Sequence, residues 1–365
     1  MTMNRRVTGF HRFADRYAGI PLIFLPSLYR KRRGIPKKVR RICIVKTAGI
    51  GDTVLMSAVV KDIIKHYHGC HVTVVTGIGN YFAAKFLIGR LCCNIEFKVA
   101  DLSDFSSIFD LRHLEEFDLL IDFGQWPRFD AFISMLIKSK FRIGFKRDRQ
   151  YRHYSYDMAV EHKSDRHEIN NFRAIGSALG VYCLYGHEFY EVYRSTDIGD
   201  NVITIHMCAS GKTASLRMWS MEKWAELIMK LDERGFEIVF TGAESERDYI
   251  EAVAGFSGIG YCRAMIDRHF EEIVPVLKKS RYVISVDTGI AHMAAACGAR
   301  LLELLGPTNP ERWGALGDNV TYIRPESVGK MLDLGHETDI DTDAMKRITV
   351  DQVLKHIRDY GDEFA

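Results

Sequence analysis

The stretch HMCASGKT, residues 206–213, combines the residue types that can hold a phosphate group. An apolar run leads into small residues, hydroxyls and cations, which suit a pyrophosphate or a charged leaving group at the carboxyl end of a strand. The same pattern also fits a solvated loop with an incidental lysine. The residues that would make the phosphate contacts are Ser210, Gly211, Lys212, Thr213 and, after a short gap, Arg217.

The loop does not satisfy the P-loop pattern of enzymes that bind nucleoside triphosphates. That pattern, G-x-x-x-x-G-K-[ST], begins with a glycine in a tight turn, where this chain has His206. The residues after Thr213, ASLRMW, also do not predict the helix that a P-loop lysine begins. The strand RYVISVD (281–287) ends like a magnesium-binding strand and is the feature that supports a triphosphate site. We expect the loop to hold phosphates without hydrolysing a triphosphate.

Two aspartates stand in turns that precede predicted helices. Asp52 follows the AGIG turn, and Asp287 ends the RYVISVD strand. A carboxylate in such a turn either acts on a ligand, for example by taking a proton from an acceptor hydroxyl, or caps the helix that follows. Position alone favours the cap at Asp52, and the same interpretation applies to Asp287.

Two successive series of strands and helices position these residues. RICIVK (41–46), FDLLIDFG (117–124) and FRIGF (141–145) are predicted strands of the first series. NVITIH (201–206) and RYVISVD belong to the second series. This alternation predicts mostly parallel sheets with helices on both faces, so the fold class is α/β. We expect two Rossmann-like doubly wound domains that face each other across a cleft, because such units bind ligands outside the carboxyl ends of their strands.

The length of 365 residues suits two domains. The predicted parts are a basic and apolar N-terminal arm (1–40), a first domain (41–185), a hinge (186–200), a second domain (201–345) and a C-terminal helix (346–365) that packs on either domain. The 8 cysteines form no CxxC pair and lie mostly in apolar runs, which predicts free thiols rather than a disulfide frame or a zinc site.

The charge of the chain is unevenly placed. A net charge of +3 is too small to predict nucleic-acid binding, but basic residues crowd the arm around the segment GIPLIFLPSLY. This segment is far shorter than the roughly 20 apolar residues of a membrane-spanning helix, and no small-residue cleavage site marks a secretory signal. The arm therefore either lies on an anionic membrane surface or packs loosely on the body as a solvated tail.

Three stretches together resemble glycosyltransferase family 9, the heptosyltransferases of bacterial lipopolysaccharide synthesis. VKTAGIGDTVLMSAVV (45–60) is similar to the family's strand, glycine-aspartate turn and helix. HMCASGKTASLRMWSMEKWAELI is similar to its small-residue turn, Lys-x-Trp and helix. SVDTGIAHMAAACGARLLELLGPTNP (285–310) is close to its Asp-Thr-Gly-x-x-His helix start and Gly-Pro-Thr-x-Pro turn. With weaker similarity in the gaps, the resemblance runs from about residue 41 to about residue 355.

The resemblance implies a GT-B fold and inverting transfer of a sugar from a nucleotide donor, without a metal or other cofactor. It implies that Asp52 is the general base for the acceptor hydroxyl. Glu246 lies where enzymes of this fold often bind the nucleotide ribose, unless it only complements the start of a helix. Further donor contacts are implied for Asp287, Thr288, Gly289 and His292, although a structural pairing of Asp287 with His292 is the alternative.

One residue of the donor loop departs from the family pattern, since Arg217 stands where the heptosyltransferases commonly have lysine. A guanidinium keeps the charge but changes its reach and geometry, so a donor other than ADP-heptose stays open.

For the acceptor, KSKFRIGFKRDRQYRHY (138–154) brings cations to a strand end of the first domain, where phosphorylated or carboxylated sugars would be attracted. A solvated loop is the alternative. The patch comprises Lys146, Arg147, Arg149 and Arg152, and the acceptor contacts that we predict are Arg142 and Arg147.

These observations predict an inverting, metal-independent glycosyltransferase that moves a heptose from ADP-heptose to a lipopolysaccharide core or a related surface glycan. The nucleotide sugar is a substrate, no cofactor is expected, and no nucleic acid is a partner. We expect the protein in the cytoplasm, with contact to the inner face of the inner membrane if the arm binds lipid. The alternatives are the same fold with another nucleotide-sugar donor, a nucleotide-sugar epimerase or hydrolase, and a non-catalytic paralogue that binds nucleotide sugars.

Overall fold

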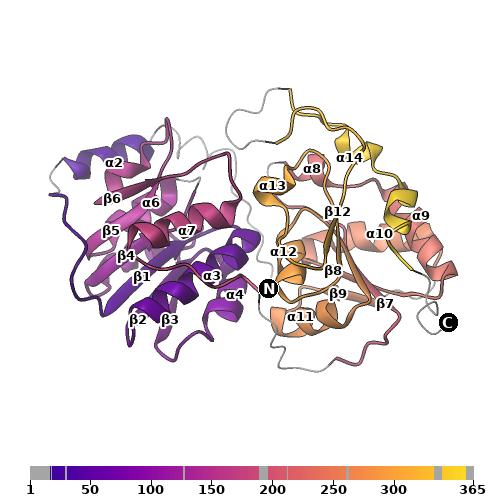
Figure 1. Cartoon of the computed structure of the whole chain (residues 1–365), viewed down its shortest axis with the longest axis horizontal. Coiled ribbons are helices and arrows are strands. Elements are labelled where there is room, and N and C mark those ends of the chain that lie inside the picture. Colours follow the sequence, from indigo (N-terminus) through magenta and orange to yellow (C-terminus); the bar gives the residue numbers. More distant parts are fainter. Residues whose placement is uncertain are drawn as a thin grey trace. The chain divides into compact units, whose positions relative to one another are not determined.

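The computed structural model describes residues 17, 19–28, 31–125, 128–188, 196–211, 213–259, 263–332 and 339–358. The chain divides into two compact units, and the boundary lies between His187 and Glu188. Each unit consists of a parallel sheet covered by helices (Figure 1).

The first unit contains a six-stranded sheet in the order β3-β2-β1-β4-β5-β6, with all neighbours parallel. The central strands are continuous apolar runs because helices cover both of their faces. The strands are β1 (Arg41–Lys46), β2 (His71–Thr76), β3 (Ile95–Val99), β4 (Phe117–Asp122), β5 (Ser139–Lys146) and β6 (Met158–Glu161).

Helices α3 (Ile50–His66), α4 (Ile78–Ile88) and α7 (Glu168–Ala178) pack together along this sheet (Figure 1). Helix α6 (Arg128–Leu136) packs instead against α2 (Gly19–Ser27) and the single turn η2 (Arg152–Ser155). The remaining short helices of the unit are α5 (Phe105–Asp110) and η1 (Leu111–His113).

The second unit repeats this plan with the order β12-β11-β10-β7-β8-β9, again parallel throughout. Read from its own first strand, each sheet has the order 3-2-1-4-5-6 of a doubly wound Rossmann-like fold. The strands are β7 (Val202–His206), β8 (Glu237–Gly242), β9 (Arg263–Ile266), β10 (Tyr282–Val286), β11 (Leu301–Leu304) and β12 (Val320–Ile323).

Helices α9 (Met221–Glu233), α10 (Arg247–Ser257) and α15 (Val350–Leu354) pack together in the second unit, and α11 (Phe270–Lys279) packs with α12 (Gly289–Ala296). Side chains of α15 join the large apolar core of this unit, so the C-terminal helix packs on the second domain. The short elements are α8 (Ala214–Arg217), η3 (Glu244–Glu246), α13 (Pro310–Trp313) and α14 (Ala344–Arg347).

Most sequence-predicted elements are present, and two details differ. A single turn of helix, α8, follows Thr213 where no helix was expected, although four residues are far shorter than the helix of a P-loop. The segment around Pro21 and Pro26, for which the sequence made no helix prediction, forms α2. Within the part of the chain that the structure describes, no helix is long and apolar enough to cross a membrane.

Candidate functional site

Each sheet reverses its winding direction between two central strands, and the sequence-predicted residues gather at those two places. In the first unit the reversal lies between β1 and β4, and in the second unit between β7 and β10. Loops that leave such a switch point in opposite directions open a crevice at the carboxyl ends of the strands, where doubly wound folds bind ligands.

The first switch point holds an ion pair between Lys46, the last residue of β1, and Asp52, in the first turn of α3. The Nζ of Lys46 lies 2.9 Å from Oδ2 of Asp52. The lysine side chain is 4% exposed and the aspartate side chain 25%, so the pair presents its carboxylate rather than its ammonium to the surface. A carboxylate in this position is able to accept a proton from a bound hydroxyl group.

The cap interpretation of Asp52 is wrong, because α3 begins three residues earlier than that interpretation requires. The N-cap is Gly49, whose φ of 88° lies in the left-handed region that favours glycine. A Cβ at this position would also lie 2.7 Å from Oδ2 of Asp52. Glycine at position 49 therefore allows both the turn and the close approach of the carboxylate.

Three hydrogen bonds, made by two side chains, fix the turn between β1 and α3. The Nδ2 of Asn80 donates to the carbonyl of Lys46 at 2.9 Å and to Oγ1 of Thr53 at 3.0 Å. The hydroxyl of Thr53 donates in turn to the carbonyl of Gly49 at 2.7 Å. Since Asn80 and Thr53 are fully buried, this bonding holds the ends of β1 and α3 in one geometry.

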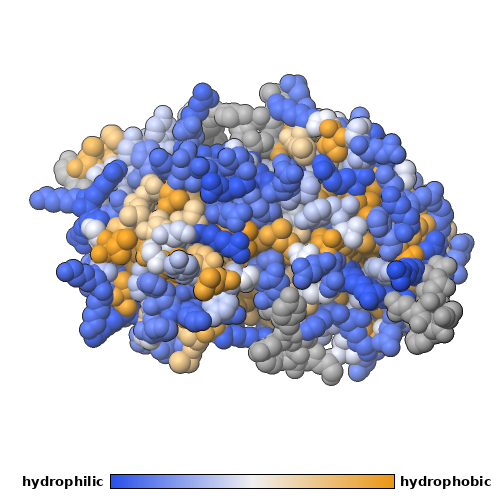
Figure 2. Space-filling view, in the orientation of Figure 1, coloured by the Kyte–Doolittle hydropathy of each residue, from blue (hydrophilic) through white to orange (hydrophobic). Residues whose placement is uncertain are grey.

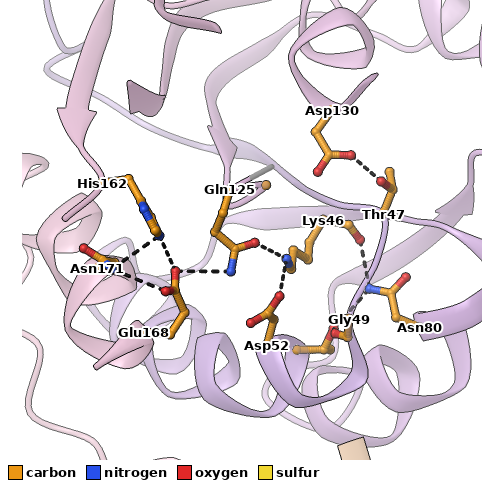
Figure 3. Close-up of polar contacts among 12 residues, drawn as sticks. Lys46, Thr47, Gly49, Asp52, Asn80, Gln125, Asp130, His162, Glu168 and Asn171 are labelled. Atoms are coloured by element: carbon orange, nitrogen blue, oxygen red, sulfur yellow. Dashed lines mark hydrogen bonds and ion pairs between the residues drawn. The ribbon is translucent and has the colours of Figure 1, made fainter. Parts of the chain in front are cut away.

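A chain of buried polar side chains extends from the ion pair into the first unit (Figure 3). The Lys46 ammonium also donates to Oε1 of Gln125, which follows β4. The Nε2 of Gln125 donates to Oε1 of Glu168 at 3.2 Å, and the same oxygen lies 2.5 Å from Nε2 of His162. Asn171 reaches the second Glu168 oxygen at 3.4 Å.

A second buried cluster stands behind the ion pair and contains Asp122, Asp130, Arg152 and Tyr156. Arg152 donates to Oδ2 of Asp122 at 3.1 Å and to the Tyr156 hydroxyl at 3.1 Å, and it is fully buried. The sequence interpretation that put Arg152 in an acceptor patch is therefore wrong. Burial, followed by the charge of Asp122, raises the pKa of Asp130 to about 6, and Thr47 donates its hydroxyl to Asp130.

At the second switch point, Arg217 ties together the segments that follow β7 and β10. One guanidinium nitrogen donates to the carbonyl of Ser210 at 2.5 Å. The other donates to the carbonyl of Asp287 at 2.8 Å and lies 3.4 Å from its Oδ2. Thr308 donates its hydroxyl to the same Oδ2 at 2.8 Å. The forked geometry of arginine makes these contacts from one side chain, which a lysine is unable to reproduce.

Asp287 is also not a helix cap, because Thr288 holds the N-cap position of α12 and makes no side-chain cap bond. Gly289 is the first residue of α12, and His292 is buried in the same helix. The structure thus brings Asp287, Thr288 and Gly289 to the carboxyl end of β10, beside the loop that Arg217 holds.

The phosphate-loop residues lie directly after β7. Ser210 and Gly211 are exposed, and Gly211 has a φ of 93°, where a residue with a Cβ is strained. Thr213 is half-buried and forms the N-cap of α8, whereas the prediction for Lys212 lies outside the described residues.

Glu246 lies after β8 and accepts a hydrogen bond from the Ala243 N–H at 2.9 Å, the contact expected of a residue that supports a helix start. His206, the last residue of β7, lies near Glu246, and burial lowers the pKa of this imidazole. Its Nδ1 donates to the carbonyl of Thr241 at 2.9 Å.

The two predicted acceptor residues differ in placement. Arg142 lies within β5, is buried, and donates to the carbonyl of Ile137 at 2.6 Å. The prediction that it belongs to an exposed acceptor patch is therefore wrong. Arg147 follows β5 and is half-buried, while Lys146 and Arg149 beside it are exposed. The exposed cations of this segment therefore lie at the carboxyl end of β5.

Sequence reasoning missed Lys46, Gln125, Glu168 and Thr308 as members of the two sites. The sequence could have predicted Lys46, because a lysine at the end of an apolar strand is buried only if it has a partner of opposite charge. Gln125 and Glu168 are separated by 43 positions and meet only in the folded unit.

Among the described residues, no group of three or more histidine, cysteine, aspartate or glutamate side chains could hold a metal ion.

Two doubly wound Rossmann-like units, each with its polar residues at the switch point, define the GT-B class of fold. Residues 112–341 match the profile of glycosyltransferase family 9 (heptosyltransferase), which covers more than half of the chain. The protein belongs to this family.

Comparisons with relatives agree with this assignment. The chain is 31% identical to lipopolysaccharide heptosyltransferase 1 of Escherichia coli K12 over 146 residues, which span 40% of this chain and 43% of that one, less than half of its length. It is 22% identical to the lipopolysaccharide core heptosyltransferase OpsX of Haemophilus influenzae over 80% of this chain and 86% of that one. The structure of E. coli heptosyltransferase WaaC with ADP superposes with a TM-score of 0.68 and 20% identity, covering 89% of this chain and all of that one.

Proposed function

We propose that the protein is an inverting glycosyltransferase that moves a heptose from ADP-heptose to a lipopolysaccharide core or a related surface glycan. The observation that carries this proposal is the partly exposed Asp52 carboxylate at the first switch point, held beside a buried ammonium. In addition, relatives over part or most of the chain are named as lipopolysaccharide heptosyltransferases, and one neighbouring structure contains ADP-2-deoxy-2-fluoro heptose.

In the proposed reaction the first unit supplies the base and the second unit binds the donor. Asp52 takes the proton of the acceptor hydroxyl, whose oxygen attacks the anomeric carbon on the face opposite the leaving group. The bond from that carbon to the phosphate oxygen breaks, ADP departs with the electron pair, and the configuration inverts. The loop from Ser210 to Thr213, the start of α12 and Glu246 are the proposed donor contacts, with backbone N–H groups and cations stabilising the developing charge. No metal takes part in this scheme.

We further propose that the first unit docks on an anionic membrane surface. Ile23 of α2 is fully buried against α6 and Tyr156, while Leu22 and Leu25 are 51% and 57% exposed. Figure 2 shows apolar side chains at the surface where α2 lies in Figure 1, with hydrophilic side chains around them. Exposed Lys31, Arg32 and Arg33 follow the helix. The leucines would insert into the apolar part of the lipid, and the cations would bind its anionic headgroups.

Calorimetric titration with ADP-heptose, GDP-mannose, UDP-glucose and ATP with magnesium, each with and without EDTA, tests the donor. We expect selective binding of ADP-heptose that EDTA does not change. Preference for another sugar nucleotide would replace the donor but keep the mechanism, and magnesium-dependent binding of ATP alone would contradict the proposal. Turnover of the donor without an acceptor would indicate an epimerase or hydrolase instead.

A further inference from the structure

A chain of buried polar side chains leads from Asp52 to Glu168 and has no role in the proposed reaction. Lys46, Gln125 and Glu168 are nearly or fully buried, and each contacts the next (Figure 3). Only the Asp52 end of the chain is open to a ligand, with a quarter of that side chain exposed. These side chains therefore connect the buried end directly to the carboxylate that a substrate would meet.

The two neighbours of Gln125 fix the orientation of its amide. An ammonium group only donates hydrogen bonds, so Lys46 must face the amide oxygen. A carboxylate accepts, so Glu168 must face the amide nitrogen, which lies 3.2 Å away. A flipped amide would put N–H groups against the ammonium and an oxygen against the carboxylate, which breaks both bonds.

Glu168 is itself held on several sides. It is the first residue of α7, where the helix dipole stabilises a negative charge. His162 contacts one of its oxygens at 2.5 Å, and Asn171 contacts the other at 3.4 Å. Asn171 also bonds the backbone of Lys163 in both directions, at 3.0 and 2.9 Å, which fixes the segment that carries His162.

We propose that Glu168 is a positioning residue for the transfer reaction, acting on Asp52 through Gln125 and Lys46. Its carboxylate orients the Gln125 amide, the amide oxygen holds the Lys46 ammonium, and the ammonium keeps the Asp52 carboxylate oriented. A proton acceptor has to be deprotonated when the acceptor hydroxyl arrives, and an opposite charge within about 4 to 6 Å favours that state. This inference rests on the proposed role of Asp52.

The charged groups around the chain come from six elements. They are Lys46 of β1, Asp52 of α3, Asp122 of β4, Asp130 of α6, Arg152 of η2 and Glu168 of α7, together with His162 after β6. Lys46 contacts Asp52 directly, whereas Arg152 contacts Asp122, and the charges of both cations act on Asp130. Removal of the Lys46 ammonium would therefore leave Asp52 without the cation that contacts it.

The test is a double-mutant cycle on the full chain with Glu168→Gln, Lys46→Met and the combination of both. We expect Glu168→Gln to lower kcat about tenfold and to change the acid limb of the kcat/KM profile, with donor KM within about twofold of wild type. In the Lys46→Met background, Glu168→Gln should have no further effect, because its influence passes through the ammonium. Additive losses, or a change in KM alone, would overturn the proposal.

Two variants separate this role from general damage to the fold. Glu161→Gln neutralises an exposed carboxylate at the end of β6 and should leave kcat and the pH profile at the wild-type values. Gln125→Met removes the relay amide without touching the start of α7 and should reproduce the effects of Glu168→Gln, so the proposal remains testable if Glu168→Gln does not fold. Wild-type behaviour of a folded Gln125→Met protein would overturn it.

A spectroscopic readout distinguishes failure of the relay from failure of the proposed function. If wild-type protein transfers no sugar, the proposed function fails, but the carbon-13 chemical shift of the Asp52 carboxyl group still tests the relay. We expect that shift to differ from wild type in both Gln125→Met and Glu168→Gln, because the Lys46 ammonium beside Asp52 is no longer held in place. An unchanged chemical shift in both variants would contradict the relay even in an active enzyme.

Discussion

The two switch points use the same kind of ion pair in opposite ways. In the first unit the cation is inside and the carboxylate faces outward, with the Lys46 and Asp52 side chains 4% and 25% exposed. In the second unit Arg217 and Asp287 are almost equally exposed, and both are bonded to the loops around them. One fold plan thus presents an outward-facing carboxylate in the first unit and a tied loop in the second, which matches the proposed division into a base in the first unit and donor binding in the second.

The largest effect should come from Asp52→Asn, which removes the acceptor of the proton. We expect kcat to fall about a thousandfold, within the range for loss of a general base, while donor affinity stays within a few-fold. Steady-state kinetics measures kcat, and calorimetry on the same preparation measures donor affinity. Wild-type transfer by the variant would remove Asp52 from its role.

A smaller effect, on binding rather than on chemistry, should follow from Arg217→Ala. The loop after β7 loses its bonds at the Ser210 and Asp287 carbonyls, so donor affinity should fall about thirtyfold. Arg217→Lys keeps the charge but not the fork, and its affinity should lie between those of the alanine variant and wild type. Equal calorimetric affinities for all three proteins would show that donor binding does not depend on the contacts of Arg217 with the loop.

The double variant Leu22→Asp, Leu25→Asp changes only the surface that we assign to lipid. Partitioning onto vesicles with anionic lipid should fall about tenfold at low salt, because two exposed apolar side chains and part of the local positive charge are lost. Sedimentation with the vesicles measures this. Transfer to a soluble acceptor should be unchanged, and undiminished vesicle binding would leave α2 a structural element only.

The smallest effect concerns the stability of the first unit and its dependence on pH. The pKa of Asp130 is raised to about 6, so between about pH 4 and about pH 6 the folded protein retains a proton that the unfolded chain has lost. This group therefore makes the free energy of unfolding fall as the pH rises through that window. Asp130→Asn should remove a decrease of up to about 3 kcal/mol, since the shift is about two pKa units and each unit corresponds to about 1.4 kcal/mol.

Urea unfolding of both proteins near pH 4 and near pH 7 measures the contribution of Asp130. If the free energy of unfolding changes equally between the two pH values in wild type and variant, the pKa of this carboxyl group is not raised in the folded protein.

The centre of each sheet was predictable from sequence because its strands are continuous apolar runs. RICIVK and FDLLIDFG became β1 and β4, as predicted. The edge strands β3 and β12 are short and only partly buried, so they have no clear apolar pattern in the sequence.

The sequence predicted where several site residues lie, but not which residues they contact. The glycine turns placed Asp52 and Ser210 at strand ends, but the early start of α3 depends on the backbone angle of Gly49, which no residue type alone reveals. Likewise, the basic spacing of segment 138–154 does not reveal that Arg152 pairs with Asp122, because that contact depends on tertiary packing.

The most direct test of the account is a transfer assay with the purified full-length protein, ADP-heptose and lipopolysaccharide from a strain that lacks core heptose. Mass spectrometry of the lipopolysaccharide measures the product, and Asp52→Asn protein is the matched control. The account predicts that wild-type protein adds one heptose, with or without EDTA, and that the control adds none. Absence of heptose transfer by the wild-type protein, or equal transfer by both proteins, would contradict it.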